Sequence, residues 1–188
     1  MKTKILKLAT VLSAAALTVS FSGPAAAGSA TANLNVSALV SGSCTITGGS
    51  LAFGYYDPTV TNAAAGVDLN APTSTGSIQV NCVTGSPSVS IGLGNGLNYT
   101  TTRRMLGTLV GNYMNYQLYL PPSTTPGTTC TYPGATIWGT TAGTDTLDPA
   151  NTTWDGTAKT FYVCGTVPKG QTVAADTYTD TVVATVNF

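Results

Sequence analysis

Four cysteines and seven aspartates are the side chains best suited to chemistry in this 188-residue chain, which contains no histidine and no glutamate. Enzymes move protons most often with histidine or glutamate, so acid–base catalysis would fall to aspartate, tyrosine, lysine or cysteine. Three of the aspartates, Asp57, Asp148 and Asp155, stand directly before proline or glycine, which is typical of turns. The sequence therefore predicts no enzyme, no catalytic residue and no cofactor.

A metal site is not predicted either. The cysteines lack C-x-x-C spacing, and there is no histidine to complete a zinc site. Asp145, Asp148, Asn151 and Asp155 lie close together in the sequence, but their spacing does not match a calcium-binding loop. We expect this stretch to be a solvated loop that binds no metal.

An even number of cysteines in an exported chain indicates disulfide bonds. Four cysteines allow three pairings, and the sequence alone does not choose rigorously among them. We favour Cys44 with Cys82 and Cys130 with Cys164, because each cysteine lies in or beside a predicted strand and is joined to its nearest partner. Closing loops of these lengths would contribute roughly 3–4 kcal/mol each.

Residues 1–27 have the organisation of a signal peptide: three lysines, a short apolar run and then Ala25-Ala26-Ala27. Cleavage after Ala27 is our first choice, and cleavage after Ala30 is the alternative. The apolar run is too short and wrongly flanked for a spanning helix. The sequence therefore predicts export through the periplasm and no transmembrane segment.

The expected mature chain carries few charges. Four cationic residues stand against seven aspartates after residue 27, a formal charge of −3, which offers no basic surface for nucleic acid. Charged residues make up only 7% of the whole chain, far below the usual quarter or so. Such a hydroxyl-rich, weakly charged surface suits a protein packed against copies of itself. The remaining length of roughly 160 residues is enough for one domain with a core.

Period-two alternation of apolar and polar residues recurs along the chain, and no segment predicts a helix. The predicted strands are residues 31–41, 44–47, 51–54, 77–83, 89–93, 103–109, 113–120, 136–139, 157–164 and 177–188. Turn residues separate these short runs. The pattern favours an all-β, antiparallel sandwich.

The first and last predicted strands stand apart from the others. Residues 31–41 place one apolar set on a single face, and Ser41-Gly42-Ser43 follows as a hinge; that set is Ala32, Leu34, Val36, Ala38 and Val40. The last strand places Val182, Ala184, Val186 and Phe188 on one face, and the sequence stops within it. We predict that residues 28–40 are a donor strand for a neighbouring molecule and that the last strand is an unpaired acceptor edge.

Several short pieces run through the chain in a specific order. They are Cys44-Thr45-Ile46, Leu51-Ala52-Phe53-Gly54, Tyr56-Asp57, residues 76–82, Arg104-Met105, Leu118-Tyr119, Trp138-Gly139, Val167-Pro168-Lys169-Gly170-Gln171 and Tyr178-Thr179-Asp180 leading to Phe188. As an ordered set spanning the expected mature chain, they resemble the spore coat protein U domain, which also forms the subunits of archaic, Csu-type chaperone–usher pili.

The resemblance implies an incomplete immunoglobulin-like sandwich that lacks its last strand. A periplasmic chaperone holds such a subunit open, and an outer-membrane usher replaces the chaperone strand with the N-terminal strand of the next subunit. The donor segment of the family maps onto residues 31–40, and its usual disulfide maps onto Cys44 and Cys82. A single domain at residues 41–188 favours a shaft or minor subunit over a two-domain tip adhesin.

The predicted function is therefore a structural pilus subunit that polymerises head to tail at the cell surface and supports adhesion and biofilm formation. Its predicted partners are homologous subunits, a periplasmic chaperone and an outer-membrane usher, with no nucleic acid. The alternative is a self-complemented, secreted coat or carbohydrate-binding protein, in which residues 31–40 fold back into their own sandwich.

Overall fold

The computed structural model describes residues 29–86, 88–109 and 111–188. The predicted signal peptide, residues 1–27, lies outside the described residues. The chain divides into two units, residues 1–39 and residues 40–188. Residues 29–39 of the first unit carry no helix or strand and have exposed side chains. All strands among the described residues belong to the second unit.

The second unit is built from ten short strands. They are β1 (Cys44–Gly48), β2 (Leu69–Asn70), β3 (Ser77–Cys82), β4 (Ser90–Leu93), β5 (Arg103–Gly107), β6 (Tyr113–Tyr119), β7 (Lys159–Tyr162), β8 (Cys164–Val167), β9 (Tyr178–Thr179) and β10 (Ala184–Asn187). The part of the chain that the structure describes contains no helix, so none there is long and apolar enough to cross a membrane.

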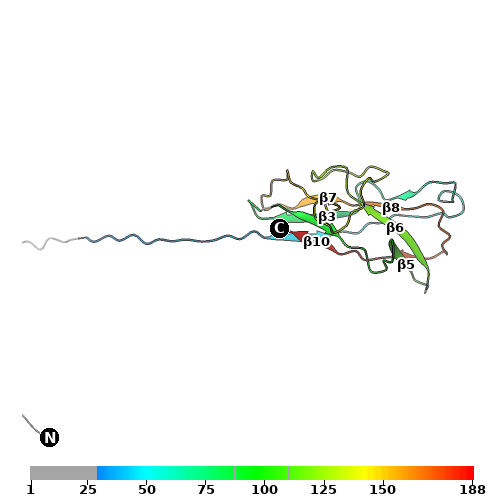
Figure 1. Cartoon of the computed structure of the whole chain (residues 1–188), viewed down its shortest axis with the longest axis horizontal. Coiled ribbons are helices and arrows are strands. Elements are labelled where there is room, and N and C mark those ends of the chain that lie inside the picture. The colour runs from blue at the N-terminus through cyan, green and yellow to red at the C-terminus, as the bar shows by residue number, and fades with distance from the viewer. Residues whose placement is uncertain (1–28, 87, 110) are drawn as a thin grey trace, which may run out of the picture. The chain divides into compact units, whose positions relative to one another are not determined.

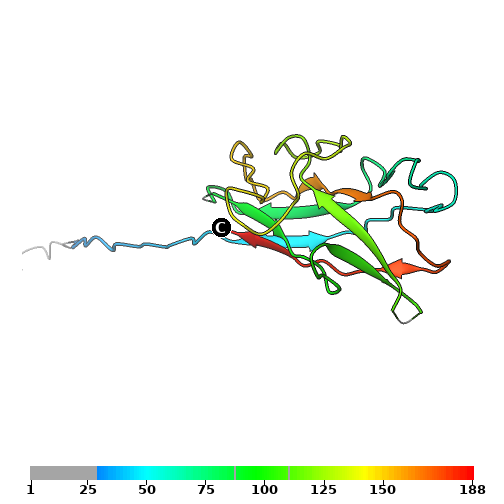
Figure 2. The same ribbon diagram turned by 45° about the vertical axis from the view of Figure 1, so that its right-hand side comes forward.

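Every ladder between these strands is antiparallel. The strands form three sheets, with orders β1-β3-β7, β10-β4 and β2-β8-β6-β5-β9. β9 and β10 are successive pieces of one extended segment that pairs first with β5 and then with β4. Figures 1 and 2 show the layered arrangement of these strands. The prediction of an all-β antiparallel sandwich is confirmed.

Alternation along the strands explains the core. β3 buries Ile78, Val80 and Cys82, and β6 buries Met114, Tyr116 and Leu118 from the facing sheet. Because side chains of a strand point alternately to its two faces, each of these strands contributes every second residue to the interior. Loop residues close the core, above all Trp138, Leu147 and Trp154.

Both favoured disulfides are present. Cys44 faces Cys82 directly across the β1–β3 ladder, with Cα atoms 4.1 Å apart. Cys130 lies in a loop and joins Cys164 of β8, with Cα atoms 5.4 Å apart. The first bond ties β1 to the core strand β3, and the second ties the long loop after β6 to the sandwich.

Three predicted strands, at residues 31–41, 51–54 and 136–139, are not assigned as strands, and two, at 157–164 and 177–188, are each divided into two. Residues 51–54 are not a strand, because no neighbouring strand pairs with them in the described chain. Residues 136–139 contribute only an isolated bridge between Ile137 and Tyr119. The predicted strand at 157–164 is replaced by β7 and β8, which belong to different sheets. Alternation detects the extended backbone in these segments but does not show whether a pairing partner exists.

One buried cation supports the interior. Arg103 of β5 is 2% exposed, and its guanidinium donates to the carbonyl oxygens of Leu93, Gly94 and Trp138 and to the side-chain oxygen of Gln117. A buried guanidinium is tolerated when its donors are satisfied in this way. Arg103 thereby ties the end of β4 to β5, β6 and the Trp138 loop.

Candidate functional site

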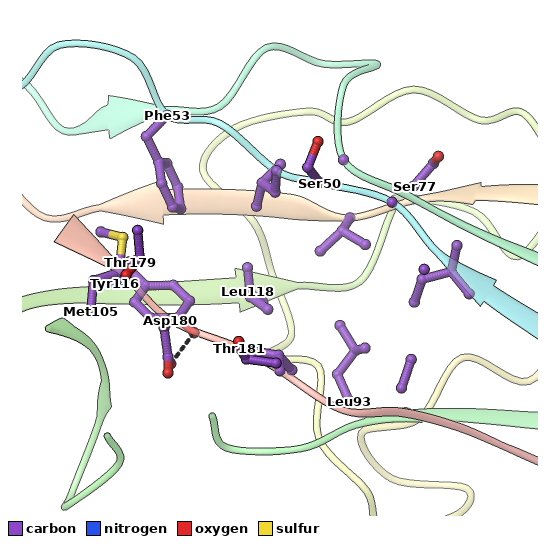
Figure 3. A pocket seen from close by; sticks show the side chains of 18 of the residues that line it. Ser50, Phe53, Ser77, Leu93, Met105, Tyr116, Leu118, Thr179, Asp180 and Thr181 are labelled. Carbon is purple, nitrogen blue, oxygen red and sulfur yellow. Dashed lines mark hydrogen bonds between the residues drawn. The ribbon is translucent and has the colours of Figure 1, made fainter. Parts of the chain in front are cut away.

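An apolar cleft of about 440 Å³ opens between two segments of the sandwich. One side is formed by residues 48–53, which continue from β1, and the other by residues 178–184, which lead from β9 into β10. The floor is supplied by core side chains of the strands beneath: Ile78, Leu93, Met105, Tyr116, Leu118 and Val163. Figure 3 shows Phe53 and Ser50 on one side, residues 179–181 on the other, and Leu118 between them.

A second cavity of about 760 Å³ continues the cleft along the same two segments. It shares Leu51, Phe53, Met105 and Tyr178 with the first cavity, and its sides extend to Thr59 and back to Val173. Along the groove, residue numbers rise on the first rim while they fall on the second. The two rims therefore run in opposite directions. We call the combined feature the acceptor groove, with rims formed by residues 48–59 and 173–184.

Backbone groups on both rims lack backbone partners. Among the described residues, no backbone hydrogen bond joins residues 50–55 or 180–182 to another backbone group. The carbonyl of Val183 accepts from Gly94 on the β4 side. Because alternate residues of an antiparallel strand direct their backbone groups to opposite edges, the even-numbered residues Val182 and Ala184 present theirs to the groove. Unpaired backbone groups on two facing edges over an apolar floor form a site for an extended strand.

The second rim directs alternate side chains inward. Tyr178, Val182, Ala184 and Val186 are half-buried against the core, while the odd-numbered residues between them are exposed. Three of the four predicted acceptor-edge residues, Val182, Ala184 and Val186, thus lie on the inner face. The fourth, Phe188, follows the end of β10 and is 52% exposed.

A carboxylate, that of Asp180, lies in the middle of this rim. Asp180 accepts from the hydroxyl of Tyr116 at 2.7 Å, from the amide of Leu97 at 3.0 Å and from the side-chain nitrogen of Asn98 at 3.3 Å. Figure 3 shows the contact with Tyr116. Burial and this hydrogen bond raise the pKa of Tyr116 above its ordinary value, so the hydroxyl is protonated and donates. Asp180 thereby anchors the rim to β6 and to the loop after β4.

A second aspartate fixes the far end of the same rim. Asp176 accepts from the backbone amide of Leu109 at 2.9 Å and from the hydroxyl of Thr108. These hydrogen bonds, the Leu109 amide first, lower the pKa of Asp176 to about 2. Sequence reasoning missed both carboxylates. The signal that could have found them is the alternation over residues 176–186. In this segment the even-numbered residues are the partly buried ones, and both aspartates have even numbers.

The predicted donor residues are exposed and lie outside the assigned strands. Leu34, Val36 and Val40 are 87%, 85% and 83% exposed, and Ala32 and Ala38 are exposed as well. Residues 29–43 have no assigned strand, and an isolated strand has no partner for its hydrogen bonds. The donor role of these residues stays a prediction.

The other aspartates weighed for chemistry serve turns. Asp145 accepts from the amide of Thr141, Asp148 from the hydroxyl of Thr146, and Asp155 from Thr157 and Lys159. Within residues 29–86, 88–109 and 111–188, no three histidine, cysteine or acidic side chains gather as metal ligands would.

Comparison with known proteins identifies related chains. Residues 30–185 match the Spore Coat Protein U domain family. Protein U of Myxococcus xanthus is 42% identical over 194 residues, which cover 94% of each protein. A crystal structure of the CsuC–CsuE chaperone–tip adhesion subunit pre-assembly complex, from archaic chaperone–usher Csu pili of Acinetobacter baumannii, aligns with 18% identity and a TM-score of 0.49. The aligned region covers 79% of this chain and 40% of that solved chain.

Proposed function

Because the chain belongs to the Spore Coat Protein U domain family, we propose that it is a structural subunit of a chaperone–usher pilus. Each subunit would receive the N-terminal strand of one neighbour in its acceptor groove and would donate its own residues 31–40 to the groove of another. Repetition of one head-to-tail contact produces an open filament rather than a closed ring. The filament would stand on the cell surface and support adhesion and biofilm formation.

The observation that carries the proposal is the acceptor groove. It has an apolar floor, two opposed rims and, in the described chain, unpaired backbone groups on both rims at residues 50–55 and 180–182. A sheet edge of this kind binds an extended segment through ladder hydrogen bonds and through pockets for alternate side chains. Such a groove has no evident use in a finished, self-contained sandwich.

The predicted donor strand matches this requirement. Its apolar face presents Leu34, Val36 and Val40, all exposed in the isolated chain, together with two alanines. Burying these side chains in the groove is worth on the order of 5–10 kcal/mol. Each ladder hydrogen bond adds roughly 0.5–1.5 kcal/mol before the cost of ordering the segment.

The proposed partners follow from the same geometry. An open groove with exposed apolar surface is prone to aggregation before assembly, so a periplasmic chaperone would occupy it first. An outer-membrane usher would then exchange the chaperone for the next subunit. Export would depend on the predicted signal peptide at residues 1–27. No enzymatic activity is proposed, because the groove is lined mainly by apolar and hydroxyl side chains and by two carboxylates, Asp176 and Asp180, that anchor one rim.

The proposal is tested on surface material sheared from cells that produce the full-length chain. Unboiled samples should run as a ladder in denaturing gels, and boiling should collapse the ladder to one band, because strand-paired joints resist detergent but not heat. A chain that stays monomeric when a chaperone and usher are supplied would instead be the self-complemented alternative, and the pilus proposal would be wrong.

A further inference from the structure

The segment Val167-Pro168-Lys169-Gly170-Gln171 lies where β8 leaves its neighbour β6. The two strands pair from Cys164 to Thr166 on β8, opposite Tyr119 to Gln117 on β6. Two residues further along the same register, Asn115 of β6 would face Pro168. Proline has no amide hydrogen, so it cannot donate to the carbonyl of Asn115. The ladder must end here unless another group takes the place of Pro168.

The side chain of Gln171 takes that place. Its Oε1 accepts from the backbone amide of Asn115 at 2.7 Å, and its Nε2 donates to the carbonyl of Asn115 at 2.9 Å. The same nitrogen also donates to the carbonyl of Pro168 at 3.0 Å. Because a primary amide offers an acceptor and a donor as a peptide unit does, Gln171 continues the β6 ladder through its side chain.

The backbone of Gln171 is joined to the first rim of the acceptor groove. Its amide donates to the hydroxyl of Tyr56 at 3.0 Å, and Tyr56 lines the second cavity of the groove. The Tyr56 hydroxyl lies 3.0 Å from the carbonyl of Pro168 and 3.1 Å from that of Asn62, either of which accepts its hydrogen. The ring of Tyr56 belongs to the buried core, so the core holds this hydroxyl in place.

The second rim begins just after Gln171, at Val173. Both rims are thus tied to one point of β6: the first through Tyr56, and the second through the chain that leaves Gln171. Among the described residues, the hydrogen bond from Gln171 to Tyr56 is the one that joins the first rim directly to residues 170–184. The hydrogen bonds of Asp176 and Asp180 hold the second rim alone.

We propose that Gln171 is a positioning residue of the acceptor groove, which fixes the distance between the two rims at their far end. It does so by binding β6 through its side chain and Tyr56 through its backbone. This role rests on the proposed function, because the distance matters only when a strand is bound. Neighbouring strands lie about 4.7–4.9 Å apart, so a strand that pairs with both rims requires them to be about 9–10 Å apart. Without Gln171 the sandwich still folds, but the rims are no longer held at this spacing.

Gln171→Glu makes the test depend on pH. Glutamate has the shape of glutamine, but its carboxylate has no hydrogen to donate to the carbonyls of Asn115 and Pro168. A protonated carboxyl again provides one acceptor and one donor, and the two carbonyl oxygens favour this neutral form. Acid should therefore restore the function of this variant. Gln171→Met keeps the length of the side chain without its hydrogen bonds and should not respond to acid.

The assay starts from purified chaperone-bound subunits and measures the heat-sensitive ladder per amount of bound subunit. Each variant is normalised to the parent at the same pH, which removes the effect of the aspartates that all variants share. Both Gln171 variants should give at least about tenfold less polymer at pH 7. At pH 4, below the ordinary glutamate pKa of about 4.3, Gln171→Glu should come within about twofold of the parent, while Gln171→Met should stay defective.

Thr146→Val is the matched control. Thr146 is also buried and makes two side-chain hydrogen bonds, with the amide of Gly143 and the carboxylate of Asp148, but it lines neither cavity of the groove. This variant should assemble like the parent. A loss equal to that of Gln171→Met would show that any missing hydrogen bond impairs assembly, and the proposed role would be wrong.

Tyr56→Phe breaks the same connection from the first rim, because it keeps the ring in the core and removes the hydroxyl. It should also assemble poorly, and the double variant Y56F/Q171M should lose little more polymer than Gln171→Met alone, since both changes act on one connection. Losses that multiply in the double variant would contradict the proposal. If the Gln171 variants are not recovered with the chaperone, Tyr56→Phe decides, and its normal assembly overturns the proposal.

The parent chain separates this proposal from the proposed function. If the parent gives no heat-sensitive ladder, the pilus proposal itself fails. If the parent assembles but Gln171→Met does so equally well, or if the defect of Gln171→Glu is the same at pH 4 and pH 7, only the role of Gln171 fails.

Discussion

Replacing Val36 with aspartate is the most direct test of strand donation, because Val36 lies at the centre of the apolar face of residues 31–41. Its side chain is 85% exposed in the isolated chain, so the substitution removes no contact from the described fold. Any defect must therefore arise when the segment is buried elsewhere. We expect Val36→Asp to fold and to bind a chaperone, but to fail in assembly.

The expected size of the defect follows from two contributions. Burying a valine side chain is worth about 1.5–3 kcal/mol, which the variant loses. A buried aspartate without a partner must also be protonated, and at pH 7 this costs about 4 kcal/mol, since its pKa in water is about 3.9 and each pH unit is worth about 1.4 kcal/mol. The joint is thus weakened by about 6 kcal/mol at pH 7.

The protonation cost makes the defect depend on pH. At pH 4.5 neutralising the aspartate costs less than about 1 kcal/mol, so the weakening of the joint should fall from about 6 to about 3 kcal/mol, and the part that remains is mainly the lost burial of valine. Val36→Asn carries a polar side chain that does not titrate, and it should assemble poorly at both pH values. Asn35→Asp places the same charge on the outer face of the strand and should assemble like the parent.

The assay incubates purified chaperone-bound subunits at pH 7 and pH 4.5 and quantifies the heat-sensitive ladder, with each variant normalised to the parent at the same pH. Normal assembly of Val36→Asp at pH 7 would refute the donor assignment. If Asn35→Asp fails and Val36→Asp does not, the two faces of the strand have been exchanged, and the assignment of its inner residues is wrong.

Three further predictions concern the sandwich itself. Hydrogen bonds, chiefly the one from the Leu109 amide, lower the pKa of Asp176 to about 2. The ionised carboxylate therefore stabilises the fold fully above about pH 4, and this stabilisation is lost as the pH falls towards 2. The melting temperature of Asp176→Asn should accordingly fall less between pH 4 and pH 2 than that of the parent. Replacing both Cys130 and Cys164 with serine removes a cross-link spanning 34 residues and should lower the free energy of unfolding in urea by about 4 kcal/mol; a loss below about 1 kcal/mol would contradict the role given to this bond. Arg103→Lys leaves several buried carbonyl oxygens without donors and should cost about 2–4 kcal/mol in the same urea measurement, whereas an unchanged midpoint would contradict it.

The sandwich was predictable because alternation is a local property. In β3 and β6, every second residue is apolar, and these residues are the buried ones. The disulfides were predictable for a related reason, because Cys44 and Cys82 lie on neighbouring strands that pair directly. In both cases residues in or beside a strand pattern carry the information.

The acceptor groove was not predictable in the same way. Residues 51–54 alternate as a strand does, yet in the described chain they have no strand partner, and pairing depends on segments far away in the sequence. Asp180 was overlooked because a carboxylate interrupts an apolar face, and its partners Tyr116 and Leu97 lie 64 and 83 residues away. Local patterns thus locate extended segments but leave open which edges stay unpaired.

The rims of the groove are held by contacts that do not involve the missing strand. Gly49 donates to Ser77 on one rim, and Leu51 packs so closely on Gly165 that a Cβ there would approach its side chain to 2.6 Å. Asp180 and Asp176 anchor the other rim to separate loops. A groove fixed in this way binds a strand without first being ordered itself, so less of the binding energy is lost on ordering.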